Sequence, residues 1–191
     1  MLLTDLFLLR DTPYRHAAES PRAPLWMAGF VLGIGALYGG LVAWFQRLLG
    51  GPLQGVAVAE IPWKLLLGGN VISGVLAALV FHGGATLIVW LMSRAVGGPG
   101  RLGTLYRATA YLLALGAPAL PRLALESAAA GAPGAELPAA GLIAALAWIS
   151  PALLLAGLYR LVRATQGLGP GRSATAVVLT GFFAFAVAFA V

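Results

Sequence analysis

The chain has 191 residues, of which 60% are hydrophobic and only 9% are charged. Soluble domains carry roughly 25% charged residues, so this composition excludes a soluble fold and indicates one integral membrane domain. The net charge of +6 comes from basic residues that form no run or stripe, which argues against nucleic-acid binding, and the absence of cysteine excludes disulfides and thiolate metal sites.

Residues 1–24 are predicted to form a cytoplasmic N-terminal segment. Its start, MLLTDLFLLR, is apolar but contains Asp5 and has no basic residue ahead of it, so it is not typical of a secretory signal. One interpretation is a short amphipathic helix that lies at the membrane interface. The other is a disordered terminus.

Five apolar stretches follow within residues 25–191, each close to the roughly 20 residues that a spanning helix needs. We predict spans at residues 25–45, 68–92, 104–123, 137–159 and 173–191. The third span is the weakest, because Arg107 and Arg122 enclose only 14 uncharged residues. Both arginines could reach the interfaces from a full-length helix that Pro118 and Pro121 kink near its far end. The alternative is a re-entrant segment, which would reverse the last two spans.

Basic residues predict the orientation of the bundle. Nine arginines fall in the N-terminal segment and in the loops after the second and fourth spans, whereas the other side has only Arg47, Lys64 and Arg122. The nine are Arg10, Arg15, Arg22, Arg94, Arg101, Arg107, Arg160, Arg163 and Arg172. Because basic loops stay on the cytoplasmic side, the prediction is an all-α bundle of five transmembrane helices with the N-terminus inside and the C-terminus outside.

Tryptophans at the span ends support these boundaries, since tryptophan favours membrane interfaces. Trp26 and Trp44 bracket the first span, and Trp63 and Trp90 bracket the second. The exception is Trp148, which falls at the middle of the predicted fourth span. We interpret it as a residue that packs between helices or faces lipid.

The second predicted span holds four polar residues that we consider as candidate functional residues inside the bilayer. His82 is the only titratable group deep in a span, and Thr86 follows one turn later on the same face. Asn70 and Ser73, near the outer end, could bond to another helix or line an outward vestibule. His82 could relay a proton or bind a metal, but one histidine supplies one ligand and no carboxylate lies inside a span. The other interpretation, which we prefer, is a structural histidine that is hydrogen-bonded within the bundle. These four residues are the basis of an alternative function, a small channel or transporter.

A glycine-rich turn precedes the third span. Residues 98–103 match the spacing G-x-G-x-x-G, but they follow a membrane span instead of a strand, which excludes a dinucleotide site. The sequence predicts a tight, flexible inner turn whose glycines permit left-handed backbone angles. Together with Arg94, Arg101 and Arg107, this turn is a candidate binding site for anionic lipid head groups.

Two further features are the glycine pairs of the first span and the loop before the fourth span. Gly29 and Gly33, then Gly35 and Gly39, form two G-x-x-x-G pairs that favour close helix packing within the bundle or between two copies of the chain. The loop before the fourth span holds Glu126 and Glu136 among Ala, Gly and Pro, and we predict a flexible linker there.

Signatures of the common enzyme and transporter classes are absent from the sequence. There is no Walker loop, no G-x-S-x-G, no H-E-x-x-H and no carboxylate set typical of a magnesium-dependent lipid transferase. The spans also do not form two halves of matching hydropathy. We therefore expect no enzymatic activity and no cofactor.

The chain resembles the YIP family (Ypt-interacting proteins), in particular its bacterial members. The resemblance rests on the block Gly97–Gly100, the following Tyr106-Arg107-Ala108-Thr109-Ala110-Tyr111, and Pro118. The approach Pro13-Tyr14-Arg15 and Pro21, and the stretch from Trp148 through Tyr159–Arg163 to Ser173-Ala174, are also similar. Eukaryotic members carry an acidic-aromatic cytosolic motif, Asp-Leu-Tyr-Gly-Pro, which this chain lacks.

The resemblance implies a five-span protein with an inner N-terminus and no enzymatic activity. The expected function is to organise membrane or partner proteins, through contacts with anionic lipids. The expected location is the bacterial inner membrane. Membrane lipids are the expected partners, and a second copy of the chain is a further candidate.

Overall fold

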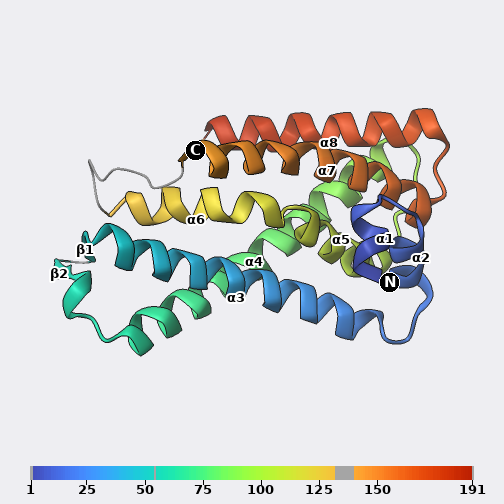
Figure 1. Cartoon of the computed structure of the whole chain (residues 1–191). Coiled ribbons are helices and arrows are strands. Elements are labelled where there is room, and N and C mark those ends of the chain that lie inside the picture. The colour runs from blue at the N-terminus through green and yellow to red at the C-terminus, as the bar shows by residue number, and fades with distance from the viewer. Residues whose placement is uncertain (1, 54, 132–139, 191) are drawn as a thin grey trace. The chain divides into compact units, whose positions relative to one another are not determined.

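The computed structural model describes residues 2–53, 55–131 and 140–190, with side chains for 3–53, 55–131 and 141–186. Figure 1 follows the chain from blue at its start to red at its end. Helices dominate the described residues, and the strands found there are two short ones in a hairpin, β1 (Pro52–Leu53) and β2 (Val56–Ala57). The predicted all-α class is therefore confirmed.

Two short helices form the N-terminal segment. α1 spans Leu2–Phe7, and α2 spans Thr12–Glu19 with Pro13 in its first turn, where a missing N–H costs nothing. The chain turns between them near Leu9, whose φ is 54°. α2 packs against α5, and α1 packs against both of them. The segment is thus helical, as one of the two interpretations proposed, but its helices are packed on the protein.

Three helices are long and apolar enough to cross a membrane: α3 (Ala23–Leu49), α4 (Trp63–Ala95) and α7 (Ala140–Gln166). They contain the first two predicted spans and the described part of the fourth. Each helix extends several residues beyond the predicted limits, because the apolar count stops at the first charge whereas the backbone hydrogen bonds continue past it.

A bent pair of helices stands at the predicted third span. α5 (Leu102–Leu115) is followed by a 3₁₀ turn, η2 (Ala117–Ala119), and by α6 (Leu120–Ala129), and the pair bends by 45°. Counted as one span, the pair would be a fourth membrane crossing. The predicted kink is confirmed, and its cause is the pair of prolines, Pro118 and Pro121, which remove backbone donors at the break. A broken span and a re-entrant segment share this bend.

The predicted fifth span, residues 173–191, corresponds to α8 (Pro170–Ala190). α8 packs along α7, as shown by Gly181, where an added Cβ would lie 3.7 Å from Leu155 Cδ2. Its side chains are described only to residue 186, and residues 137–139 and 191 of the predicted spans also lie outside the described residues.

Packing divides the chain into two compact units. Unit 1 consists of Met1–Phe30, Val80–Leu115 and Ala152–Val191, and unit 2 of Val31–Leu79 and Gly116–Pro151. The long helices α3, α4 and α7 each have one end in each unit. Unit 1 has the larger core, built around Tyr14, Leu105, Tyr111, Leu115 and Leu161.

Two features stabilise unit 2: a close crossing of α3 and α4, and a loop that a side chain of α3 binds. An added Cβ at Gly35 would lie 2.6 Å from Val75 Cα, and one at Gly74 would lie 2.8 Å from Gly39 N, so α3 and α4 touch through their backbones. Beyond the crossing, a short 3₁₀ helix, η1 (Val58–Glu60), follows the hairpin. Arg47 Nη1 donates to the carbonyl of Val58 at 2.6 Å, which fixes this loop on α3.

The predicted flexible linker was wrong for Glu126, which lies on α6. Its Oε1 accepts a hydrogen bond from Arg122 Nε at 2.7 Å, one turn earlier on the same helix. Alanine-rich sequence favours helix, and this i,i+4 pair adds to it. Glu136 lies outside the described residues.

Candidate functional site

The glycine-rich turn ends α4 in a defined geometry. Gly97 N donates to Arg94 O at 3.0 Å, and Gly98 N donates to Ser93 O at 2.8 Å. Gly97 has a φ of 83°, so these bonds form the paired C-terminal cap in which a left-handed residue satisfies the last helical carbonyls. Within the predicted turn, residues 98–103, Gly100 is left-handed with a φ of 68°, whereas Gly98 is not and Gly103 lies on α5.

Two polar side chains fix the turn from its flanks. Trp90 Nε1 donates to Gly100 O at 3.0 Å. Gln166, at the end of α7, accepts from the backbone N–H groups of Gly100 and Arg101 at 3.2 and 3.4 Å. Gln166 is buried, and its Oε1 accepts hydrogen bonds from two backbone N–H groups that would otherwise be unpaired. The turn is thus a rigid platform for the arginines around it.

Four arginines surround this platform. Arg94 lies over the Trp90 ring, with its guanidinium carbon 5.7 Å from the ring centre, and Arg101 is exposed. Arg107 donates through Nε to Gly103 O at 3.3 Å. Arg172 was not among the residues assigned to this site from the sequence, but its Nη1 would lie 3.6 Å from a Cβ added at Gly97. Within the described residues none of the four forms an ion pair.

The turn belongs to a strongly basic unit. Unit 1 contains nine arginines against Asp5, Asp11 and Glu19, a formal net charge of +6. Two of these carboxylates are engaged, Asp5 with Arg10 at 2.8 Å and Asp11 with Arg160 at 3.5 Å. Unit 2 has three basic residues and three glutamates, so its formal charge is zero. The entire net charge of the chain therefore belongs to unit 1.

The N-terminal helices are anchored in unit 1 by two tyrosines. Tyr14 of α2 is fully buried, and its hydroxyl, which has no hydrogen-bond partner in the described residues, lies 2.9 Å from the Cβ position at Gly157. Burial, and secondarily the charge of Asp11, raises the pKa of Tyr14. The hydroxyl of Tyr111 on α5 lies 3.4 Å from Nδ1 of His16 on α2. These contacts place the N-terminal segment firmly against α5 and α7.

The structure brings together two of the four polar residues predicted on α4. His82 and Thr86 are each 1% exposed. Thr86 Oγ1 donates to the His82 carbonyl at 2.8 Å and lies 2.6 Å from Thr109 Oγ1, which is itself 3.4 Å from His82 Nδ1. The His82 ring also packs on Tyr106, with centres 4.6 Å apart. The cluster is a buried polar contact between α4 and α5.

Asn70 and Ser73 lie in unit 2 and have different surroundings. Asn70 Nδ2 donates to Gln46 Oε1 at 3.0 Å and to the Leu66 carbonyl at 2.9 Å, so it joins α3 to α4. Ser73 is exposed and makes no side-chain hydrogen bond among the described residues. An interhelical bond is the common use of a polar residue in a bundle, and Asn70 fits that use.

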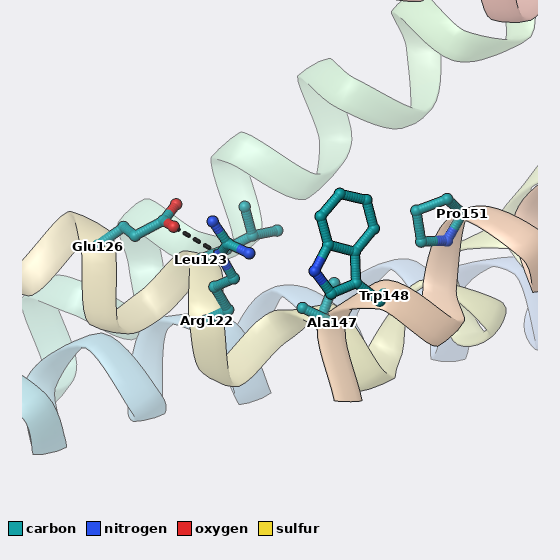
Figure 2. Close-up of a pocket in the computed structure, with 7 residues that line it drawn as sticks. Arg122, Leu123, Glu126, Ala147, Trp148 and Pro151 are labelled. Atoms are coloured by element: carbon teal, nitrogen blue, oxygen red, sulfur yellow. Dashed lines mark hydrogen bonds and ion pairs between the residues drawn. The ribbon is translucent and has the colours of Figure 1, made fainter. Parts of the chain in front are cut away.

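A groove in unit 2 was missed by the sequence reasoning. It has a volume of about 290 Å³ and opens between the η2–α6 segment and α7 (Figure 2). Its lining residues are Ala119, Arg122, Leu123, Glu126, Ala147, Trp148 and Pro151. Trp148 is 74% exposed at the groove. The i,i+4 spacing of Arg122 and Glu126 was the one signal that could have indicated it, had α6 been recognised as a helix.

Comparisons with known proteins identify no relative from which a function could be inferred. No protein-family model matches the sequence, and no match is found among curated proteins or among solved structures. The functional argument therefore rests on the charge distribution and contacts described above.

Proposed function

We propose that the chain is a non-enzymatic, YIP-like integral membrane protein whose basic unit 1 binds anionic lipids on the inner side of the membrane and thereby organises membrane or partner proteins. The observation that carries this proposal is the partition of charge, with a formal +6 in unit 1 and zero in unit 2. Clustered arginines beside a membrane attract anionic head groups, at about 1 kcal/mol for each basic residue near the surface.

The proposed topology has five spans, with the N-terminus inside and the C-terminus outside. All three segments assigned to the inner side by their arginines, namely the N-terminal segment and the turns after α4 and α7, belong to unit 1. The β1–β2 hairpin, which the proposed topology assigns to the outer side, belongs to unit 2. The same grouping thus arises from helix packing and from the positive-inside rule, two independent sources.

Exposed apolar residues on α1 support contact with the inner leaflet. Leu3, Phe7 and Leu8 are exposed, and Arg10 follows them. An apolar face flanked by arginine is typical of a segment that lies in the interface. The turn at Gly97–Gly100 and the start of α5, which carry the YIP resemblance, belong to the same unit, and a bacterial inner membrane is the proposed location.

We favour lipid binding over a channel along α4. A conducting path needs polar side chains that reach water, whereas His82 and Thr86 are buried and hydrogen-bonded to Thr109. The exposed arginines around Gly97–Gly100, in contrast, have no carboxylate partner in the described residues.

Lipid preference can be tested by thermal unfolding in mixed micelles that contain phosphatidylglycerol or phosphatidylcholine. Binding to the folded state raises stability by mass action, so we expect a higher Tm with phosphatidylglycerol and a smaller gain at high salt. The double variant Arg101→Gln/Arg107→Gln should lose most of this gain. Lys64→Gln, an exposed charge in unit 2, is the matched control and should keep it. Equal Tm values with both lipids would refute the proposal.

Orientation can be tested with introduced cysteines, since the chain has none. In intact cells a membrane-impermeant thiol reagent should label Glu60→Cys but should label Glu19→Cys only after lysis. Both glutamates are exposed, so they are a matched pair. Arg163→Cys distinguishes the two forms of the bent pair, because it stays protected if α5–α6 crosses the membrane and becomes labelled if that segment is re-entrant.

A further inference from the structure

The groove on α6 and α7 combines three chemically distinct groups around one opening. Figure 2 shows the Arg122–Glu126 pair on one wall and the Trp148 indole on the other, with Pro151 beyond it. Arg122 bonds to Glu126 through Nε and Oε1 at 2.7 Å. No other side-chain hydrogen bond to this pair is found in the described residues, so the two Nη groups of Arg122 and Oε2 of Glu126 keep their bonding capacity.

These free groups complement a zwitterion. The Nη groups of a guanidinium bind phosphate oxygens with charge-assisted hydrogen bonds, and a free carboxylate oxygen accepts from a primary ammonium. Because unit 2 has no net charge, it does not select for an anionic ligand as unit 1 does.

Exposed charges place the groove at the level of head groups. The side chains of Arg122 and Glu126 are 43% and 53% exposed, and exposed charged side chains of a membrane protein lie at its interfaces because the hydrocarbon core excludes them. Trp148 beside them is 74% exposed, and tryptophan favours the same level.

We infer that this groove binds the head group of a zwitterionic phospholipid that bears a primary ammonium, with phosphate on the Nη groups of Arg122, ammonium on Oε2 of Glu126 and an acyl chain along Trp148. The source is a membrane lipid, because Leu123 and Trp148 at the groove are exposed apolar surface along which acyl chains can lie. The site lies in unit 2 and uses none of the unit 1 arginines, so it is independent of the proposed function.

The test uses the full chain in nanodiscs with a phosphatidylglycerol matrix. Phosphatidylethanolamine or phosphatidylglycerol brominated on the acyl chain is added at equal mole fraction, and tryptophan fluorescence is recorded. The difference between the parent protein and Trp148→Phe isolates quenching at Trp148. We expect half-maximal quenching at about tenfold lower mole fraction of brominated phosphatidylethanolamine, a factor that corresponds to about 1.4 kcal/mol. Equal quenching by the two lipids would overturn the inference.

Two sets of variants assign the preference to the charged pair. Arg122→Gln and Glu126→Gln should each abolish it, whereas Lys64→Gln should keep it. The double exchange Arg122→Glu/Glu126→Arg retains an i,i+4 ion pair and hence the helix, but reverses the charges relative to Trp148, so it should also abolish the preference. A preference that survives the double exchange would overturn the inference, as would protection by soluble glycerophosphoethanolamine at the same concentration as the lipid.

Discussion

The crossing of α3 and α4 gives the sharpest prediction of stability. Gly39 lies where the two backbones meet, and a Cβ added there would be 2.6 Å from Asn70 C and 2.7 Å from Val71 Cα. Ordinary contacts are longer by about 1 Å, so Gly39→Ala must push α4 away. The atoms met are backbone atoms of a neighbouring helix, which cannot rotate aside as a side chain can.

Gly33 is the matched control, because a Cβ added there meets nothing within 4 Å. Both substitutions gain the same helix propensity, roughly 1 kcal/mol, so this gain cancels in their difference. The difference is then the cost of overpacking, about 1–3 kcal/mol or more where backbone must move. We expect Gly39→Ala to be less stable than Gly33→Ala by that amount.

The assay is reversible unfolding in one detergent, followed by circular dichroism for both variants. Gly35→Ala, whose Cβ would lie 2.6 Å from Val75 Cα, should behave like Gly39→Ala. Equal stability of Gly33→Ala and Gly39→Ala would refute the reasoning, because it would mean that α3 and α4 do not approach each other through the second glycine pair.

Three further outcomes are expected. Thr109→Val removes the partner of His82 Nδ1 and one of the two partners of Thr86 Oγ1, so it should destabilise the protein by about 1–2 kcal/mol in chemical unfolding, whereas Thr175→Val, at an exposed threonine, should cost less than 0.5 kcal/mol. Gly97→Ala forces a Cβ into a left-handed position and should cost about 1 kcal/mol, whereas Gly103→Ala, on α5, should not destabilise, and a larger loss at Gly103 would contradict the capping geometry. Burial raises the pKa of Tyr14, so the stability that its neutral hydroxyl contributes is complete below the ordinary tyrosine pKa of about 10 and is lost as pH rises above it. The absorbance difference at about 295 nm between the parent protein and Tyr14→Phe should therefore show no tyrosinate at about pH 10.5 until the protein is denatured, and tyrosinate in the folded protein would contradict this.

The features that the sequence predicted are those that depend on local composition. Low charge and long apolar runs predicted helices long enough to cross a membrane, and two prolines predicted the bend after α5. The tight turn after α4 followed from its glycines, because φ > 0 is nearly costless only for glycine, although the sequence did not show that Gly97 and Gly100 are the residues that adopt it. Each of these properties is decided within a few residues of chain, so no knowledge of distant contacts was needed.

The features that escaped prediction depend on which faces meet. Gly29 and Gly33 look equivalent to Gly35 and Gly39 in sequence, yet only the second pair lies at a close backbone approach. The two pairs point in different directions around one helix, and the position of α4 selects between them. Similarly, nothing local to Tyr14 shows that it is fully buried beside Gly157, since the two are far apart in the chain.

The groove at Trp148 failed prediction for a different reason. Ala, Gly and Pro after Arg122 are typical of a linker, and this interpretation hid the one-turn spacing of Arg122 and Glu126. Helix α6 forms there because Ala124, Leu125 and Ala128 pack against Val42 and Phe45 of α3, so tertiary burial decides between linker and helix. With α6 helical, the ion pair and the indole border one cavity.

The two units thus differ in the lipid chemistry that their charges suit. In unit 1 nine arginines outnumber the carboxylates threefold, so the arginines without a carboxylate partner in the described residues are left for ions or lipids to neutralise. In unit 2 the charges balance, and the Arg122–Glu126 pair already neutralises itself while it leaves donors and an acceptor free. A net positive surface gains free energy from any anionic lipid and weakens with salt, whereas a neutral dipolar groove gains only from a ligand that carries both charges at the right spacing. The preference of unit 1 for anionic lipids should therefore decrease with salt, whereas the preference of the Trp148 groove should be nearly independent of salt. This difference distinguishes the two sites within a single preparation.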